Sequence, residues 1–164
     1  MTAEQWALRE ATTSDIAILS KHRQWMFAEM QQSQTVGYAS ADVDAMAGDY
    51  ERYLQEHLGT AIRAWVMVAD GPGDHERVVA SGAILFQLWA PRPGDRTGWS
   101  ALLHSIYTAP EFRQRGLARK ITEQLVAVCR ELGCKTVNLH ASQAGRPLYE
   151  SLGFQPTSEM RLIL

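Results

Sequence analysis

The sequence predicts an α+β fold, in which helices flank one mixed, mostly antiparallel, twisted sheet. Three observations lead to this prediction. The length of 164 residues is typical of a single domain with one core, so we expect one domain over residues 1–164. Segments with a helical apolar period alternate with segments rich in β-branched and aromatic residues. A glycine- and proline-rich turn between two strands favours a hairpin, and a long amphipathic helix between two others favours a parallel strand–helix–strand unit.

The N-terminal half is expected to hold a short strand at residues 6–9 and two helices. Thr13 or Ser14 can cap the first helix, and the second covers residues 41–57. Each helix carries a stripe of side chains at helical spacing. The stripe of the first helix consists of Ile16, Leu19, Arg23, Phe27 and Met30.

The middle of the chain reads as three strands. Residues 62–69 and 78–88 are rich in β-branched and aromatic residues, and the turn signal at 70–74 between them predicts an antiparallel hairpin. Residues 90–98 carry two prolines and two glycines, which predicts a loop. A further strand is expected at residues 99–108.

The clearest helix lies in the C-terminal part. Its apolar residues recur with a period near 3.6 over residues 117–132, and Gly133 follows as a stop signal. We then expect a strand at 136–140, a short helix at 145–152 and a last strand at 160–164. The strand before the long helix and the strand after it should lie parallel.

The composition excludes several classes of protein. The net charge of −2 weighs against a nucleic-acid binder, which usually carries a basic excess. The N-terminus shows no secretory leader, and no apolar run approaches the ~18 residues of a membrane span. Two cysteines, Cys129 and Cys134, are too few for a disulfide framework or a zinc site, so no metal is expected. We therefore expect a cytoplasmic protein that contacts neither nucleic acid nor membrane.

The segment 110–119 connects a strand to the long helix and is a candidate anion site. The N-terminus of a helix presents free N–H groups and a partial positive charge, which together favour phosphate. Gly116 has no Cβ and Ala118 is small, so a phosphate can approach the backbone. The signatures GxxxxGK[ST] and GxGxxG are both absent, which argues against ATP-type and Rossmann sites. An ordinary loop with a solvated basic face remains the alternative.

A resemblance in this segment and in two segments downstream strengthens the interpretation of 110–119 as an anion site. Arg113-x-x-Gly116-x-Ala118 resembles the R/Q-x-x-G-x-G/A signature of the GNAT superfamily of N-acetyltransferases, and it follows a strand ending in Thr108-Ala109-Pro110. Downstream, residues 139–142 and 148–154 resemble the family's next strand and its LYExLGF helix. The resemblance covers about residues 99–155, whereas the N-terminal half is similar only in the order of its elements.

The resemblance implies a site for acetyl-coenzyme A, the acetyl donor of GNAT enzymes. In the family, the strand before the turn carries a bulge, diverges from its neighbour and pairs with the pantetheine arm. An amide near Ile106 or Tyr107 would polarise the thioester carbonyl. Ser142 stands where many members have an asparagine that contacts the same arm. The implied donor-binding residues are Ile106, Tyr107, Thr108, Arg113, Gln114, Arg115, Gly116, Leu117, Ala118, Arg119 and Ser142.

Tyr149 matches the family's tyrosine that protonates the departing sulfur. A phenol suits this role because, with a pKa of about 10, it keeps its proton at neutral pH. The alternative is a packed aromatic residue on an amphipathic helix. Gly145 stands where the family often has alanine, and with the following proline it marks the start of that helix.

The implied reaction is direct attack of a primary amine on acetyl-coenzyme A, with a small molecule or a peptide as acceptor. His104 is the leading candidate for the base because its ordinary pKa is near 6.5. His140, Glu29, Asp42, Asp44, Glu111 and a chain of water molecules are alternatives. The acceptor pocket, the core and a homodimer surface are all open interpretations for Trp25, Met26, Met30, Tyr38 and Trp89.

Two other functions compete with catalysis. A non-catalytic acyl-coenzyme A sensor or partner module would keep the same turn and fold. A nucleotide-binding protein of unrelated fold is a third hypothesis, against which the missing phosphate signatures and the balanced charge both count.

Overall fold

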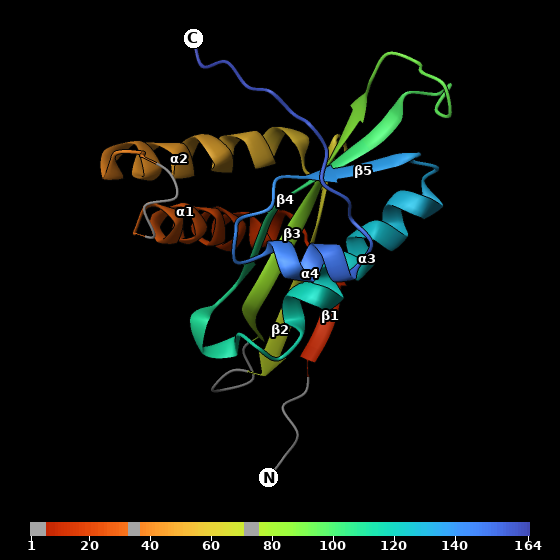
Figure 1. The fold of residues 1–164 in the computed structure, drawn as a ribbon. Coiled ribbons are helices and arrows are strands. Elements are labelled where there is room, and N and C mark those ends of the chain that lie inside the picture. Colours follow the sequence, from red (N-terminus) through yellow and green to blue (C-terminus); the bar gives the residue numbers. More distant parts are fainter. Residues whose placement is uncertain (1–5, 33–36, 71–75) are drawn as a thin grey trace.

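The computed structural model describes residues 6–32, 37–70 and 76–164. These residues form one five-stranded sheet in the order β1-β2-β3-β4-β5 (Figure 1). Neighbouring strands are antiparallel except β4 and β5, which are parallel. The predicted α+β fold with a mixed, mostly antiparallel sheet is therefore confirmed. The strands are β1 (Trp6–Glu10), β2 (Ile62–Asp70), β3 (Glu76–Leu88), β4 (Trp99–Thr108) and β5 (Thr136–Leu139), and the helices are α1 (Ile16–Gln32), α2 (Ser40–His57), α3 (Leu117–Glu131) and α4 (Arg146–Ser151).

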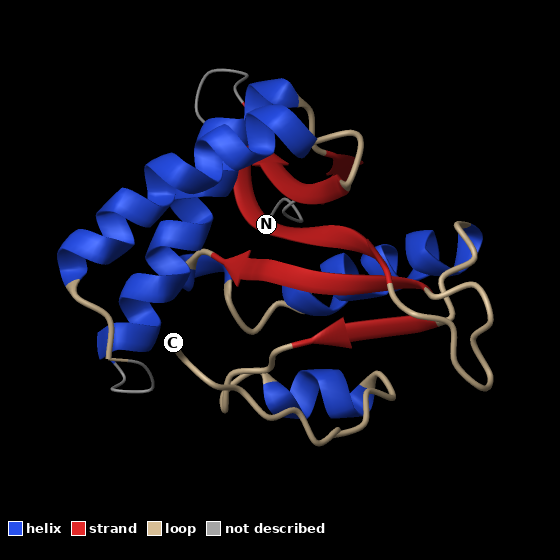
Figure 2. Ribbon diagram, turned by 90° about the horizontal axis from the view of Figure 1, so that it is seen from above, coloured by secondary structure: helices blue, strands red, loops and turns tan. Residues whose placement is uncertain are grey.

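Helices cover both faces of the sheet, as Figures 1 and 2 show. Successive residues of a strand point to opposite faces. Val66 of β2 therefore packs in a cluster with α1 and α2, whereas its neighbour Met67 packs in a second cluster with α3. The apolar stripe of α3 is buried as predicted, with Ile121 and Leu125 both at 0% exposure. Burial of each such side chain stabilises the fold by about 1.5–3 kcal/mol.

The packing of α3 on the sheet depends on Gly82 of β3. A Cβ atom at this position would lie 2.7 Å from Cγ2 of Ile121 and 3.0 Å from Cδ1 of Leu125. Only a residue without a side chain lets the helix approach this closely. Gly82 thus allows α3 to pack closely on β3, the strand that pairs with β4.

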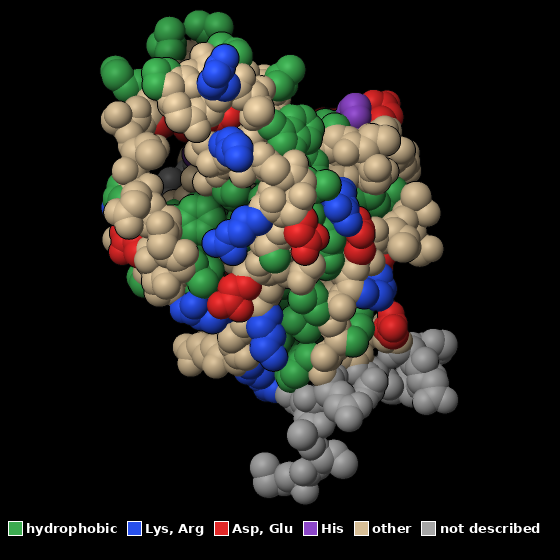
Figure 3. Space-filling view, turned by 90° about the vertical axis from the view of Figure 1, so that its right-hand side faces the viewer, with side chains coloured by type: hydrophobic (Ala, Val, Ile, Leu, Met, Phe, Trp, Pro, Cys, Tyr) green, Lys and Arg blue, Asp and Glu red, His purple; other side chains and the backbone are tan. Residues whose placement is uncertain are grey.

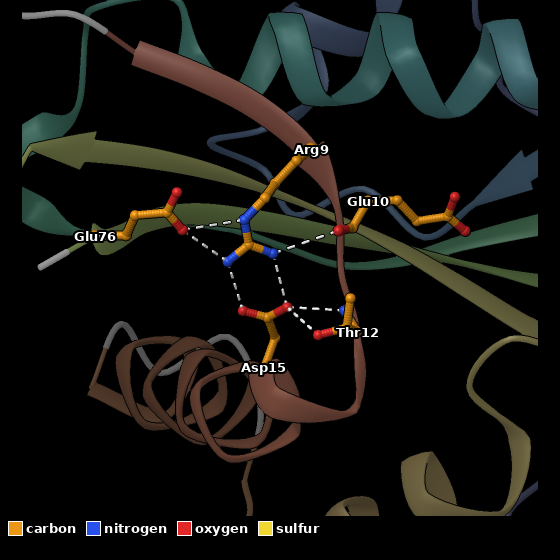
Figure 4. Close-up of polar contacts among 5 residues, drawn as sticks. All are labelled: Arg9, Glu10, Thr12, Asp15 and Glu76. Carbon is orange, nitrogen blue, oxygen red and sulfur yellow. Dashed lines mark hydrogen bonds and ion pairs between the residues drawn. The ribbon is translucent and has the colours of Figure 1, made fainter.

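An ion-pair network fixes the start of α1 on the sheet (Figure 4). Arg9 of β1 donates two bonds to the buried carboxylate of Asp15, at 2.8 and 3.0 Å, and also pairs with Glu76. The same carboxylate accepts a bond from the Thr12 N–H at 2.8 Å. The Arg9 guanidinium holds the pKa of Asp15 below its usual value. The residue that precedes the first turn is thus Thr12, so the predicted caps, Thr13 and Ser14, are wrong by one or two positions.

The predicted strand at 160–164 is also wrong. These residues form no strand, and Met160 and Leu162 are 97% and 83% exposed. Directly before this segment, the Glu159 carboxylate lies 2.9 Å from Nε2 of His140, the residue that follows β5. A strand is stable only where its main chain pairs with a neighbour, and composition alone does not supply that neighbour. The predicted hairpin of β2 and β3 is confirmed, while residues 71–74 of its predicted turn lie outside the described residues.

Within the described residues, the helices are too short or too polar to cross a membrane.

Cys129 is buried and Cys134 is half-buried, and neither forms a disulfide. Burial raises the pKa of the Cys129 thiol to about 12. Basic and acidic side chains are interspersed on the face shown in Figure 3.

Candidate functional site

One large cleft of about 1410 Å³ crosses the middle of β4. Helices α1 and α2 supply one wall, and the start of α3 together with α4 supplies the other. The cleft brings together almost all of the residues that the sequence singled out: His104, Ile106, Tyr107, Thr108, Arg113, Gln114, Gly116, Leu117, Ala118, Arg119, Ser142 and Tyr149. Arg115 is the exception, because its guanidinium lies over the rings of Trp6 and Phe112.

Strand β4 carries a bulge where it passes the cleft. Ala83 of β3 pairs with His104 and Ser81 pairs with Tyr107, so two residues of β4, Ser105 and Ile106, face the single residue between them on β3. Ser105 adopts the left-handed region, with φ of 54°, which a residue with a side chain seldom does. The expected bulge is therefore present, centred one residue earlier than Ile106–Tyr107.

The divergence of β4 from β5 follows directly after the paired segment. The parallel pairing ends at Leu103 and Leu139. Beyond this point β5 ends, and β4 continues to Thr108 without a strand on this side among the described residues. Main-chain donors and acceptors along this edge of β4 are thus open to a ligand that runs beside it.

The turn before α3 presents unpaired amides to the same cleft. Gly116 precedes α3 with φ of 77°, and a Cβ atom there would meet no atom within 4 Å. The first bond of the helix runs from the Lys120 N–H to the Gly116 carbonyl at 3.1 Å. The amides of Leu117 to Arg119 precede this bond and have no intrahelical acceptor. We call this turn the amide cradle: its free N–H groups and the helix dipole favour an anion such as a phosphate.

Arg113 contacts α1 rather than the cradle. Its Nη2 donates to both carboxylate oxygens of Glu29 at 2.7 Å, and its Nε donates to the Thr108 carbonyl at 2.9 Å. The Tyr107 hydroxyl also donates to Glu29, at 3.2 Å. Burial and the nearby Glu29 charge raise the pKa of Tyr107 to about 12. These bonds tie the turn to α1, a pairing across 84 positions of the chain that no sequence pattern announces.

The remaining basic side chain of the turn, Arg119, contacts residues of α3 and α4. It donates to the Ser151 hydroxyl of α4 at 2.6 Å and lies 3.7 Å from the Glu123 carboxylate. Arg119 therefore links α3 to α4 at the edge of the cleft. The anion-binding character of the turn comes mainly from its amides and only secondarily from these arginines.

Tyr149 lies on α4 and faces the cleft. Its ring packs edge-on against Phe154, with centroids 5.9 Å apart, and burial raises the pKa of its hydroxyl. Gly145 packs against this ring, because a Cβ there would lie 3.1 Å from Tyr149 Cε2. The Gly145 N–H donates to the Ser142 hydroxyl at 3.1 Å. The glycine at the position where the family often has alanine therefore has a steric reason, and the predicted Pro147 in the first turn of α4 is confirmed.

His104 lines the cleft in its neutral form. Its Nδ1 lies 3.0 Å from the Ser105 hydroxyl, and its Nε2 is buried without a partner. Burial, and secondarily the charge of Arg23, lower the pKa of His104 to about 4. Arg23 of α1 donates to the same Ser105 hydroxyl at 2.7 Å. Sequence reasoning missed Arg23 as a site residue, although its position in an otherwise apolar stripe was the available signal.

The other residues considered for the acceptor pocket or as the base divide into those that line the cleft and those that do not. Met26, Met30, Glu29 and His140 line the cleft. Asp44 instead accepts a bond from Gln24, and Glu111 pairs with Arg77. The remaining candidates are not among the cleft-lining residues: Asp42, Trp25, Tyr38 and Trp89.

Comparison with known proteins agrees with this geometry. A crystal structure of a GCN5-related N-acetyltransferase from Ralstonia eutropha superposes with a TM-score of 0.84 at 25% identity, covering 98% of this chain and 99% of that one. A predicted acetyltransferase from Clostridium acetobutylicum, solved with acetyl-CoA, gives 0.81 at 24% identity, covering 98% and 96%.

Similarity extends to a curated protein and to a family. Over 89 residues the chain is 32% identical to glucosamine 6-phosphate N-acetyltransferase of Trypanosoma brucei brucei, a match that spans 54% of this chain and 58% of that protein. The model of the acetyltransferase (GNAT) family matches residues 25–154, which include the bulge, the amide cradle and Tyr149. The chain therefore belongs to the GNAT acetyltransferase family.

Proposed function

We propose that this protein transfers the acetyl group of acetyl-coenzyme A to a primary amine, by direct attack of the amine while both substrates are bound. The observation that carries the proposal is the shared cleft. Its lining includes the open amide cradle, the unpaired edge of β4 and side chains of α1 and α2. The Clostridium neighbour described above was solved with acetyl-CoA, which supports this choice of donor.

The donor would occupy the α3 and α4 side. The amides of residues 114–119 would bind the diphosphate, and main-chain groups of 106–108 would pair with the pantetheine arm. The Ser142 hydroxyl accepts a bond from Gly145 and retains a proton that it can donate to the same arm. The donor supplies an activated acetyl thioester, so the protein needs only to align it and to stabilise the charge that develops.

Two groups would act on that charge. An N–H at the bulge, from Ile106 or Tyr107, would stabilise the negative charge on the thioester oxygen. The Tyr149 hydroxyl would donate a proton to the sulfur as the C–S bond breaks. Its raised pKa keeps the proton in place at neutral pH, as this role requires.

His104 would receive the proton of the amine. With a pKa of about 4, it is neutral at pH 7 and is a weak base. A weak base is sufficient late in the reaction, because the amine nitrogen becomes strongly acidic once its bond to carbon forms. The amine must already be unprotonated when it attacks, so we expect the pH dependence of kcat/KM to follow the amine. Water molecules in the cleft are the alternative proton carriers.

The acceptor is proposed here only as a primary amine on a small molecule or a peptide. The Trypanosoma relative acts on glucosamine 6-phosphate according to its name, and the match covers little more than half of that protein. The direct test is release of free thiol from acetyl-coenzyme A in the presence of a panel of amines, with glucosamine 6-phosphate and glucosamine included. Binding of acetyl-coenzyme A without thiol release would favour the non-catalytic sensor instead.

A pair of glycine variants tests the cradle itself. Gly116→Val and Gly133→Val place the same side chain at φ of 77° and 78°, at opposite ends of α3, with no atom within 4 Å of either Cβ. Each should cost about 1–2 kcal/mol of stability or somewhat more, because both residues are left-handed. Only Gly116→Val should weaken binding of acetyl-coenzyme A, measured by calorimetry. Equal affinity in the two variants would contradict the assignment of the cradle.

A further inference from the structure

The acceptor half of the cleft contains a cation without an anionic partner. Arg23 of α1 lines the cleft, and its Nη1 donates to the Ser105 hydroxyl at 2.7 Å. Its guanidinium carbon lies 4.7 Å from the centre of the Tyr50 ring and 5.0 Å from that of Phe27. Its Nε is buried and has no hydrogen-bond partner. The guanidinium of this half-buried side chain is thus flanked by two aromatic rings and one hydroxyl.

No carboxylate of the described residues forms an ion pair with Arg23. The two acidic residues that line the cleft are already paired, Glu29 with Arg113 and Asp49 with Arg52. Burial lowers the pKa of Arg23; the phenols of Tyr50 and Tyr53 oppose this shift, and no carboxylate does. Contacts with aromatic faces offset only part of the cost of removing a charge from water. A charge left in this state in the free protein indicates a partner that arrives with the ligand.

The position of Arg23 separates it from the donor's phosphates. The amide cradle lies at the start of α3, after the end of β4 and the turn that Arg113 ties to α1. Arg23 instead contacts Ser105, directly before the bulge amides that are proposed to face the reacting carbonyl. An anion bound here would therefore belong to the molecule that delivers the amine.

We propose that the acceptor is a primary amine that also carries an anionic group, a carboxylate or a phosphate, and that Arg23 binds this group. The inference rests on the proposed acetyltransferase function and deepens it. A guanidinium binds either anion through two parallel N–H···O bonds, and within the described residues the Arg23 guanidinium forms one hydrogen bond, from Nη1 to Ser105. The rings of Phe27, Tyr50 and Tyr53 leave apolar walls for a short spacer between the anion and the amine.

Matched pairs of acceptors test the proposal. Phosphoethanolamine is compared with ethanolamine, and glycine with glycinamide, by the rate of thiol release from acetyl-coenzyme A. We expect kcat/KM to be about tenfold or more higher for the anionic member of at least one pair, the equivalent of about 1.4 kcal/mol or more. The pair that shows the preference identifies phosphate or carboxylate as the anion. Equal or higher values for both neutral members would overturn the proposal.

Arg23 variants connect the preference to this side chain. Arg23→Met keeps an unbranched apolar stem and removes the guanidinium with its charge, so the ratio of anionic to neutral kcat/KM should fall about tenfold, while Arg23→Lys should retain part of it. The affinity for acetyl-coenzyme A should not change. Arg63→Met is the matched control, because Arg63 also lies over an aromatic ring, that of Trp65 at 4.8 Å, but outside the cleft.

Stability distinguishes a binding role from a structural one. If Arg23 waits for a ligand anion, the free Arg23→Met protein should resist urea as well as wild type or better, because an uncompensated buried charge has been removed. A large loss of stability with an unchanged acceptor ratio would show a structural role and overturn the proposal. Equal loss of activity toward both members of a pair would do the same.

The proposed function fails in a different way. A protein that neither binds acetyl-coenzyme A nor releases thiol with any amine would refute the acetyltransferase itself. If the donor binds and no amine reacts, phosphoethanolamine and glycine are added to the donor complex and the melting temperature is measured. A shift in wild type that disappears in Arg23→Met supports the anion site, and no shift with either compound overturns it.

Discussion

Two histidines, His22 in the core and the half-buried His104, make the fold sensitive to acid. His22 packs between the rings of Trp25 and Tyr107, with centroids 5.7 and 5.0 Å away, and His104 lies beside Arg23. Burial lowers the pKa of each histidine to about 4. In the unfolded chain both return to about 6.5. Between these values the unfolded state binds more protons than the folded state, so stability is lost as the pH falls from about 6.5 toward 4.

The size of the loss follows from the two pKa values. At about pH 5 each histidine costs roughly 2 kcal/mol relative to about pH 7.5, and both together cost about 4 kcal/mol. This is a large fraction of the 5–15 kcal/mol typical of a domain. Carboxylates contribute little at this pH, because Asp15, whose pKa lies below 3.8, begins to take up protons only in stronger acid.

Urea unfolding at about pH 7.5 and pH 5, at one ionic strength and followed by far-UV circular dichroism, measures this difference. We expect the free energy of unfolding to be about 4 kcal/mol lower at pH 5, and His22→Gln and His104→Gln each to remove about half of the difference. The double variant should show less than about 1 kcal/mol between the two conditions. Equal stability of wild type at both pH values would refute the buried, neutral state of the histidines, and so would a full difference in the double variant.

Two further variants test individual side chains of the cleft. Tyr149→Phe should lower kcat by about tenfold to a hundredfold or more and leave the affinity for acetyl-coenzyme A nearly unchanged, as steady-state kinetics and calorimetry would show; an unaltered kcat would remove this hydroxyl from the chemistry. Glu29→Gln should change the free energy of unfolding by less than about 1 kcal/mol, because its pair with Arg113 is partly exposed. The same variant should bind acetyl-coenzyme A more tightly at low salt, since a negative charge leaves the cleft and the Arg113 guanidinium is released; weaker binding would instead indicate that the pair shapes the turn.

The elements that the sequence predicted well are those whose signal is local. The stripe of α3 repeats over four turns, and Gly133 ends it with the left-handed φ that favours glycine. The composition of residues 160–164 favours a strand, but the segment has no neighbouring strand to pair with, so this prediction was wrong. A strand is a property of two chain segments, whereas an amphipathic helix is largely a property of one.

The candidate site also has parts that follow from local sequence and parts that depend on contacts between distant residues. The amide cradle follows from the order of strand, glycine and helix, which the sequence states directly. The details of the cleft depend on contacts between distant segments, such as Arg113 with Glu29 and Arg23 with Ser105. The bulge was expected from the resemblance, but its centre at Ser105 depends on how β4 pairs with β3 opposite Gly82, and no local pattern fixes that register.

Helix α1 shows why an apolar stripe alone does not identify a core. Arg23, Met26, Phe27 and Met30 recur at i, i+3, i+4 and i+7, and all four line the cleft, while Ile16 and Leu19 of the same helix are buried in the core. Helical periodicity tells which residues share a face, but it does not tell whether that face meets a sheet or a ligand. Arg23 is the one member of this stripe that a core would not accept without a partner. A charged residue within a regular apolar stripe is therefore the feature of this sequence that separates a binding wall from a packed one, and the Arg23→Met experiment tests that distinction.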